Sequence, residues 1–204
     1  MRPAEVVLQE GIRARQIGGS IEPHGDHAMG FVAFLSDTQE FQGHCIDLGS
    51  GVGLPGLILA DAFPATTWTL VERREGRTDL LRRGIRRLGL ADRVEVFSGD
   101  AVDAARSSLR QQADWVTARS FGPPADTAEC ASGFLRVGGG LLTSEPFEGD
   151  VSQRWPANTV EESTGLQLTD EWSTADGRYL RLVRTQRELP LLPRAGARRN
   201  PLFT

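Results

Sequence analysis

Short apolar runs alternate along most of this chain with longer segments whose apolar positions have helical spacing. The apolar runs cover residues 44–50, 67–72, 93–100, 114–120 and 140–145. The helical spacing occurs over residues 54–63, 74–90, 101–111 and 125–135. Strands buried on both faces of a parallel sheet are continuously apolar, whereas the helices that connect them carry one apolar stripe. The alternation therefore predicts an α/β fold with a doubly wound, mostly parallel sheet.

Residues 74–90 show the helical pattern most clearly. Leu81, Ile85 and Leu88 fall on one side of this segment. The other side carries four arginines: Arg82, Arg83, Arg86 and Arg87. We expect the apolar side to pack on the sheet and the arginines to face solvent.

The N-terminal part of the chain departs from the alternation of strands and helices. Residues 4–15 and 27–41 are predicted helices, and the turn-rich residues 17–26 separate them. We therefore expect a separate helical segment over residues 1–43.

The C-terminal part is predicted to form an antiparallel hairpin. Residues 165–173 and 178–186 have the pattern of two strands joined by a short turn. Such a hairpin suits the edge of a mostly parallel sheet. We expect one Rossmann-like domain over residues 44–204, ending in a basic tail over residues 188–204.

Composition excludes several classes of protein. The chain has 204 residues, of which 39% are hydrophobic and 25% charged, as in one ordinary globular domain. No apolar run reaches the roughly 18 residues of a membrane span, and residues 1–20 lack the apolar core of a signal peptide. Cys45 and Cys130 are too few for a disulfide framework. These features predict a cytoplasmic protein that does not enter the membrane.

All 23 basic residues are arginine. The absence of lysine excludes Schiff-base chemistry and the lysine of a P-loop, and with them pyridoxal-phosphate enzymes and P-loop NTPases.

Charge is unevenly distributed along the chain. Residues 178–204 hold seven arginines and one acid, Glu188, a balance of +6, whereas residues 1–177 hold 16 arginines and 26 acids, a balance of −10. A second group of eight arginines lies between Arg73 and Arg93. Basic segments on an acidic body favour a local anionic partner, and a solvated surface is the alternative.

The most informative segment is the glycine-rich loop DLGSGVGLPG, residues 47–56. It lies between a predicted strand and a predicted helix, where nucleotide-binding loops occur. Gly51, Gly53 and Gly56 satisfy the spacing G-x-G-x-x-G. This spacing alone is a weak signal, and it leaves an NAD-linked dehydrogenase open.

Three acids at the ends of successive predicted strands favour a different ligand. Asp47 would repel a dinucleotide pyrophosphate but suits a cation such as S-adenosylmethionine carries. Glu72, about 20 residues past the loop, is placed to accept both ribose hydroxyls, and Asp100 to meet an adenine amine. The expected donor-binding residues are Asp47, Gly49, Ser50, Gly51, Gly53, Glu72, Asp100 and Ala101.

The stretch CIDLGSGVGLPGLILA, residues 45–60, resembles the GidB/RsmG family of bacterial small-subunit rRNA guanine-N7 methyltransferases. The LPG that follows the glycines is unusual among methyltransferases generally. The segments LVERREGRTDLL and DWVTARSFGPPADTAECASGFLRVGGGLL are also similar to the family, with Arg119 at the arginine of its "ARA" motif. The ending LLPRAGARRNPL resembles the family's "PRxxGxPxKxPL". The resemblance covers roughly residues 44–204.

Four departures concern the substrate side. The family's "NLT" motif is absent, and in its "HxxDS" motif His27 is followed by Gly30 where the family has Asp. Ser144-Glu145-Pro146 stands where the family has "KG" after the fifth strand, and Asn200 where the tail has Lys.

The resemblance implies a class I methyltransferase that uses S-adenosylmethionine to methylate guanine N7 in 16S rRNA, free or in the 30S particle. Guanine N7 has a lone pair and no proton to lose, so no general base is required. Arg119 is then the expected catalytic residue, placed after the fourth strand to bind substrate phosphate or a base edge. Its alternative role is a structural ion pair with an acid such as Asp114.

The basic tail is expected to contact rRNA through Arg194, Arg198 and Arg199. No metal is expected, because His24, His27 and His44 lack the spacing of metal ligands. We expect a monomer. Two alternatives remain within the same resemblance: a methyltransferase of small molecules, and a protein that binds S-adenosylmethionine or RNA without catalysis.

Overall fold

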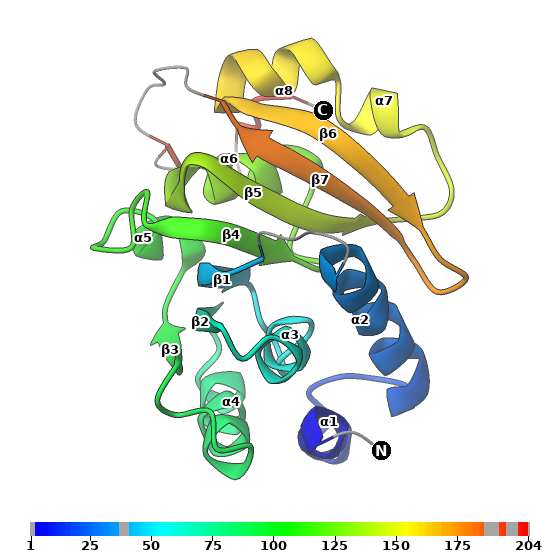
Figure 1. Ribbon diagram of the computed structural model, residues 1–204, viewed down its shortest axis with the longest axis vertical. Coiled ribbons are helices and arrows are strands. Elements are labelled where there is room, and N and C mark those ends of the chain that lie inside the picture. Colours follow the sequence, from blue (N-terminus) through cyan, green and yellow to red (C-terminus); the bar gives the residue numbers. More distant parts are fainter. Residues whose placement is uncertain (1–2, 37–40, 186–191, 195–199, 204) are drawn as a thin grey trace.

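The computed structural model describes residues 3–36, 41–185, 192–194 and 200–203. Its centre is a seven-stranded sheet in the order β3-β2-β1-β4-β5-β7-β6 (Figure 1). The strands are β1 Gly43–Leu48, β2 Thr66–Glu72, β3 Val94–Ser98, β4 Ala113–Ala118, β5 Leu135–Glu145, β6 Leu166–Ser173 and β7 Arg178–Arg184. Strands β1 to β5 pair in parallel, and β7 pairs antiparallel with both β5 and β6. The predicted doubly wound sheet with an antiparallel C-terminal hairpin is confirmed.

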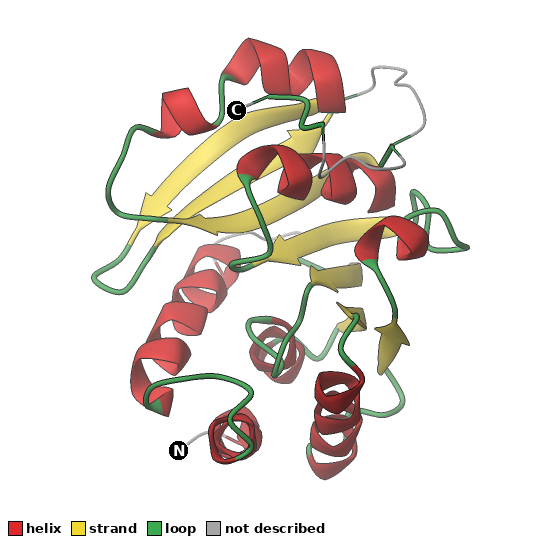
Figure 2. Cartoon of the chain, turned by 180° about the vertical axis from the view of Figure 1, so that it is seen from behind, coloured by secondary structure: helices red, strands yellow, loops and turns green. Residues whose placement is uncertain are grey.

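Helices cover both faces of this sheet, as the view from behind also shows (Figure 2). They are α1 Pro3–Arg13, α2 Ile21–Ser36, α3 Gly56–Ala62, α4 Glu75–Arg87, α5 Ala101–Ala104, α6 Pro124–Phe134, α7 Val151–Arg154 and α8 Ala157–Thr164. One apolar cluster joins the sheet to α2, α3 and α4, and the other joins it to α5, α6 and α8. Helices α3 and α4 therefore lie on one face of the sheet, and α5 and α6 lie on the other. The strand order reverses between β1 and β4, and ligands of doubly wound folds bind at such a reversal.

Helix α4 confirms the amphipathic pattern. Leu81 and Ile85 are buried, Leu88 is half-buried, and Arg82 and Arg83 on the opposite side are exposed. This apolar stripe packs on β2 and β3. Each such side chain stabilises the fold by about 1.5–3 kcal/mol when it is fully buried.

The N-terminal helices belong to the same apolar layer as α3 and α4. Leu8 of α1 and Ala28 of α2 are buried in one cluster with Ile58 of α3 and Leu80 of α4. The division into residues 1–43 and 44–204 therefore describes the order along the chain, and its status as a domain boundary stays a prediction.

Helix α2 begins earlier than the sequence pattern predicts. The pattern indicates turns over residues 17–26, but the helix starts at Ile21. Pro23 lies in its first turn, where no intrahelical N–H bond is needed. A Cβ at Gly25 would lie 3.3 Å from Oε1 of Glu5, so the glycine permits close packing against α1.

The fifth strand is longer than the sequence pattern predicts. The pattern has Gly138, Gly139 and Gly140 turning into the strand, but β5 begins at Leu135 and includes them. A Cβ at Gly139 would lie 2.9 Å from the carbonyl oxygen of Asp114, and one at Gly140 would lie 2.6 Å from the Trp115 ring. The glycines thus serve close pairing with β4, where the register shifts.

Two helical predictions are incomplete. Residues 101–111 have a helical pattern, but α5 ends at Ala104 and turns follow. Helices α7 and α8 are not predicted, because their short, polar segments carry little apolar periodicity. In the described part of the chain, no helix has the length and apolar character that a membrane span requires.

Candidate functional site

The glycine-rich loop connects β1 to α3 at the carboxyl edge of the sheet. Gly49, Gly51 and Gly53 have φ values of 65°, 58° and 107°, a region that side chains with a Cβ adopt only under strain. The backbone N–H of Ser50 donates to the carbonyl of Val71 over 3.0 Å, which fastens the loop to the end of β2. The backbone conformation is therefore by itself a sufficient reason for glycine at these three positions.

The glycines differ in what surrounds them. A Cβ at Gly53 would lie 2.4 Å from Cδ1 of Leu57, and one at Gly56 would lie 2.6 Å from Oδ2 of Asp47. At Gly51 the nearest atom would be the carbonyl oxygen of Gly49, 3.7 Å away. Gly53 and Gly56 are thus required by the packing of the protein itself. Gly51 instead leaves space open above the loop, as a site for a closely bound ligand would.

Asp47 is fully enclosed beneath the loop. Its Oδ1 accepts a hydrogen bond from the Thr117 hydroxyl over 2.7 Å, and its Oδ2 accepts one from the Gly56 N–H over 3.3 Å. Burial raises the pKa of Asp47 to about 6, against the opposing effect of its hydrogen bonds. The expected direct contact with a ligand cation is corrected: the carboxylate, at 0% exposure, organises the loop from within.

Glu72 ends β2 beside the loop, with its side chain only 5% exposed. Oε2 accepts a hydrogen bond from the Gly51 N–H over 3.0 Å, and Oε1 accepts one from the Arg74 N–H over 2.9 Å. Arg77 Nη1 lies 3.8 Å from Oε2. Each carboxylate oxygen has a second lone pair, so Glu72 retains acceptor capacity for ligand hydroxyls.

Asp100 follows β3 and caps α5. Its carboxylate accepts a hydrogen bond from the Val102 N–H over 2.9 Å. Asp100 and Ala101 line the same cavity as Glu72 and Gly49. The structure therefore brings together acids from the ends of two neighbouring strands, as the sequence predicts.

Three adjoining cavities follow the carboxyl edge of the sheet. Cavity A, of about 190 Å³, lies between Glu72 and Asp100. Cavity B, of about 340 Å³, lies over the glycine loop and is lined by Ser50 and Gly51. Cavity C, of about 450 Å³, lies beyond the end of β4 and β5. Ser120 lines all three. Of the expected donor-binding residues, Asp47 and Gly53 line none of these cavities and support the loop instead.

Arg119 lies on the loop after β4 and borders both cavity B and cavity C. Its Nη2 lies 2.9 Å from Nδ1 of His24, whose Nε2 lies 2.8 Å from the carbonyl oxygen of Gly18. A carbonyl only accepts, so Nε2 of His24 carries the proton and Nδ1 accepts from Arg119. Burial lowers the pKa of Arg119, which nevertheless stays a cation at neutral pH.

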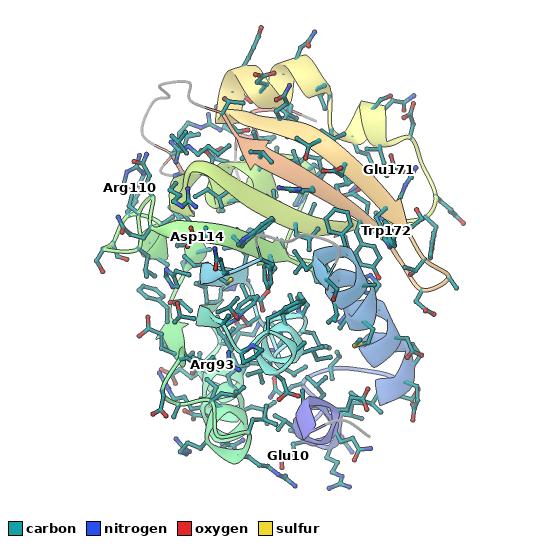
Figure 3. All side chains as sticks on the ribbon, in the orientation of Figure 1. Glu10, Arg93, Arg110, Asp114, Glu171 and Trp172 are labelled. Carbon is teal, nitrogen blue, oxygen red and sulfur yellow. The ribbon has the colours of Figure 1, made fainter. Side chains whose placement is uncertain are left out.

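The alternative partner of Arg119 has other contacts. Asp114, labelled in Figure 3, accepts a hydrogen bond from Arg136 Nε over 2.6 Å and one from the His44 N–H over 2.7 Å. The structural ion pair between Arg119 and Asp114 is therefore not formed. Arg119 keeps its guanidinium between the two cavities.

Sequence reasoning does not assign the rest of cavity C to a site. Phe121, Phe147, Glu145 and Arg154 line it together with His27. The signals in the sequence are two departures from the family pattern, at Glu145 and at Gly30, three residues after His27. Desolvation, reinforced by nearby Arg119 and His24, lowers the pKa of His27 to about 4, so its ring is neutral at pH 7.

In the C-terminal tail, Arg194 is held by contacts within the protein. The backbone N–H and the guanidinium of Arg194 donate to the Glu129 carboxylate over 2.7–2.9 Å. The side chain of Glu129 is 1% exposed. The sequence predicts an RNA contact for Arg194, but its position here is that of a structural ion-pair partner. Arg106 donates to the carbonyl oxygen of Pro193. Arg110, which Figure 3 labels, donates to the carbonyl oxygen of Leu192, so both arginines also hold this segment. Arg198 and Arg199 lie outside the described residues.

Metal ligation has no candidate in the described ranges. Among those residues, no three His, Cys, Asp or Glu side chains gather in an arrangement that could hold a metal ion. Cys45 and Cys130 are buried, and neither takes part in a disulfide.

The parallel sheet, the antiparallel C-terminal hairpin and the glycine loop at the carboxyl edge define a Rossmann-like fold of the class I methyltransferase type. A methyltransferase from Geobacter sulfurreducens shares the fold with a TM-score of 0.65 at 18% identity, over 90% of each chain. An RNA methyltransferase from Salinibacter ruber, solved in complex with S-adenosyl-L-homocysteine, has a TM-score of 0.56 at 20% identity, over 78% of this chain and 91% of its own.

Sequence comparison specifies the family. The sequence model of GidB, described as rRNA small subunit methyltransferase G, matches residues 25–146, and the chain belongs to this family. A ribosomal RNA small subunit methyltransferase G from Rhizorhabdus wittichii is 45% identical over 78 residues, 38% of this chain and 34% of its own. Another from Kineococcus radiotolerans is 38% identical over 120 residues, 58% of this chain and 46% of its own. The matched region thus spans less than half of either relative.

Proposed function

We propose that this protein transfers a methyl group from S-adenosylmethionine to guanine N7 of 16S small-subunit rRNA. Membership of the family supports this activity, and so do the names of the relatives. The observation that carries it in the structure is that the three cavities adjoin and share Ser120 as a lining residue. Glu72 and Gly51 lie on the side suited to a nucleoside, and Arg119 stands at the entrance to a further cavity.

The residues present fit the methyl donor. A Cβ at Gly51 would enter space that only a ligand fills, and the buried Glu72 carboxylate has lone pairs left for two ribose hydroxyls. Asp100 and Ala101 would hold the adenine end, and Gly49, Ser50 and Gly51 the amino-acid end. When bound, the donor supplies an electrophilic methyl group. Asp47 acts through the loop that it supports.

The proposed reaction requires that the protein position the two reactants and stabilise charge electrostatically. Guanine N7 reacts through a lone pair and releases no proton, so a general base is unnecessary. In cavity C, His27 is neutral at pH 7 and Arg119 is the cation nearest the border with cavity B. We assign Arg119 to binding and orienting the acceptor nucleotide, through a phosphate or a base edge. His24 accepts a hydrogen bond from the guanidinium and so helps to fix its orientation.

The macromolecular partner is the small-subunit rRNA, naked or within the 30S particle, and the protein acts as a monomer in the cytoplasm. The tail residues Arg198 and Arg199 are the proposed phosphate contacts there. Arg194 contributes by holding the tail against Glu129.

A small-molecule methyltransferase is the second candidate. It is favoured by the use of Arg194 inside the fold, which leaves the tail with fewer arginines available to RNA. The N-terminal departures from the family pattern agree with this candidate.

The test combines binding and product mapping. Calorimetry should show binding of S-adenosylhomocysteine and none of NAD. Incubation with labelled methyl donor and total rRNA or 30S particles should place the label on one guanine as 7-methylguanine. Binding of S-adenosylhomocysteine without RNA labelling would favour the small-molecule candidate, and binding of NAD alone would exclude both.

A further inference from the structure

We propose that Glu145 selects guanine in cavity C by accepting hydrogen bonds from N1–H and from the N2 amino group of the base. The inference rests on the proposed function, since it names the group that recognises the acceptor base of that reaction. It concerns a residue at which this chain departs from the family pattern.

Glu145 is a buried carboxylate with unused acceptor capacity. It is the last residue of β5, it lines cavity C, and its side chain is 5% exposed. Oε2 accepts a hydrogen bond from Arg154 Nε over 2.6 Å, and among the described residues the structure records no partner for Oε1. A carboxylate offers about four acceptor positions, and the bond from Arg154 uses one of them. A ligand in cavity C with adjacent N–H groups would use the remaining positions.

Only one of the four RNA bases offers two adjacent donors. The Watson–Crick edge of guanine carries N1–H beside the N2 amino group. Adenine and cytosine place a ring-nitrogen acceptor beside their amino group, and uracil flanks its single N–H with two carbonyls. A carboxylate therefore accepts from guanine with both oxygens, and it meets a repelling lone pair on each of the other bases.

The neighbours of Glu145 suit the rest of the same base. Arg154 places a donor beside the carboxylate, where guanine carries its O6 acceptor. Phe121 and Phe147 also line cavity C, and Phe147 is 57% exposed, so its ring is accessible to a base in that cavity. Aromatic side chains of this kind stack on unpaired bases.

The orientation of the base agrees with the proposed reaction. N7 lies on the edge of guanine opposite N1 and N2. A guanine held by Glu145 through its Watson–Crick edge therefore turns N7 away from β5. Arg119 lines cavity C as well and forms its border with cavity B, where the methyl donor is placed. One contact thus both selects the base and presents its reactive nitrogen.

The competing explanation is that Glu145 serves only as the ion-pair partner of Arg154. Inosine separates the two explanations, because it is guanosine without the N2 amino group. The experiment measures the fluorescence anisotropy of a labelled single-stranded RNA with one guanine, and of the same RNA with inosine there, in the presence of S-adenosylhomocysteine. The wild type should bind the guanine RNA about tenfold more tightly, as the loss of one hydrogen bond predicts.

For each variant, the quantity measured is the ratio of its affinities for the guanine RNA and the inosine RNA. In Glu145→Ala the two RNAs should bind equally, within about twofold. Glu145→Gln keeps the volume of the side chain if the alanine variant folds poorly, and its amide nitrogen opposes one base donor, so its preference should fall below about threefold. Glu148→Gln is the matched control: it removes a negative charge from an exposed position three residues after Glu145, and it should keep the tenfold preference.

An equal affinity of the wild type for the two RNAs, no binding of either, or a preference that both Glu145 variants retain would overturn the inference. Methylation of the guanine RNA by labelled donor is measured in parallel. A guanine preference that depends on Glu145 but comes without methylation supports the inference and contradicts the proposed catalysis. If the guanine RNA is methylated but the Glu145 variants keep the wild-type ratio of affinities for the guanine and inosine RNAs, the proposed catalysis is supported and the inference is contradicted.

Discussion

The backbone N–H of Gly51 donates a hydrogen bond to Oε2 of Glu72 over 3.0 Å. This contact joins the loop after β1 to the end of β2, which is its neighbour in the sheet. Gly51 lines cavity B and Glu72 lines cavity A. A single hydrogen bond therefore fixes the relative position of the two surfaces that a nucleoside with an amino-acid extension would contact.

Gly51→Val should abolish binding of S-adenosylhomocysteine. The residue has φ +58°, and its Cβ would meet no protein atom closer than 3.7 Å, so the new side chain would occupy ligand space. The variant should also lose about 1–2 kcal/mol of stability because of its left-handed backbone. Calorimetry with S-adenosylhomocysteine and thermal melting measure the two effects.

Gly89→Val is the control for backbone strain. Gly89 has φ +67°, a Cβ there would have no atom within 4 Å, and the residue lies outside cavities A, B and C. The variant should lose comparable stability and keep full affinity. Equal affinities of the two variants would show that the space above Gly51 is not used by the ligand.

Glu72→Ala should weaken binding of S-adenosylhomocysteine by about 1.5–3 kcal/mol, the usual value for hydrogen bonds to a charged group. The weakening has two sources, the ribose hydroxyls and the loop anchored through Gly51. A nucleoside analogue without ribose hydroxyls separates them, since it can lose affinity only through the loop. If the alanine variant binds both compounds as the wild type does, Glu72 is not part of the site.

Arg119→Ala should leave donor affinity within a few-fold of the wild type and lower single-turnover methylation roughly a hundredfold, as the removal of one electrostatic interaction in the transition state does. Arg119→Lys keeps the charge but loses the planar fork, and it should recover only part of the rate. His24→Ala removes the group that orients Arg119, so it should reduce the rate less than Arg119→Ala. A collapse of donor affinity in Arg119→Ala would indicate a structural arginine.

The sequence predicts the strands and the placement of Glu72 and Asp100 at strand ends because both depend on local pattern. Continuous apolar runs mark buried parallel strands, and residues such as Glu72 follow directly from a strand end. Cavity C is different, because it combines positions far apart in the chain. Its lining includes His27 of α2, Glu145 of β5 and Gly177 before β7. At its border Arg119 contacts His24 across 95 residues. No periodicity in the sequence encodes such contacts.

The role of Asp47 shows a second limit of sequence reasoning. The pattern correctly locates an acid at the end of a strand, but its enclosure beneath the loop depends on Thr117 of β4, 70 residues further along the chain. Spacing alone does not distinguish an acid that faces a ligand from one that holds the loop. The arginines of the tail pose the same difficulty, since Glu129 engages Arg194 from a distant helix.

Asp47→Asn should change the pH dependence of stability. Burial raises the pKa of Asp47 from 3.8 to about 6 in the folded protein. Its favourable contribution is therefore complete below about pH 4 and is lost as the pH rises through 6. The asparagine variant does not titrate, so its unfolding free energy relative to the wild type should increase between pH 4 and 7, by up to about 3 kcal/mol. Urea unfolding at several pH values measures this difference, and parallel profiles would contradict it.

The last prediction separates the two kinds of arginine in the tail. Arg194→Ala leaves the carboxylate of Glu129, 1% exposed, without its partner, which should cost roughly 2–3 kcal/mol of stability. The double variant with Glu129→Gln should regain part of this stability, because no charge is then left buried. Replacing Arg198 and Arg199 should leave the melting temperature unchanged and weaken rRNA binding. The slope of log affinity against log salt should flatten by up to about 0.7 for each arginine that no longer neutralises a phosphate. Donor affinity, measured by calorimetry, should stay constant in all of these variants. A salt slope that stays at the wild-type value after both replacements would show that the tail does not bind RNA, and it would favour a small-molecule substrate.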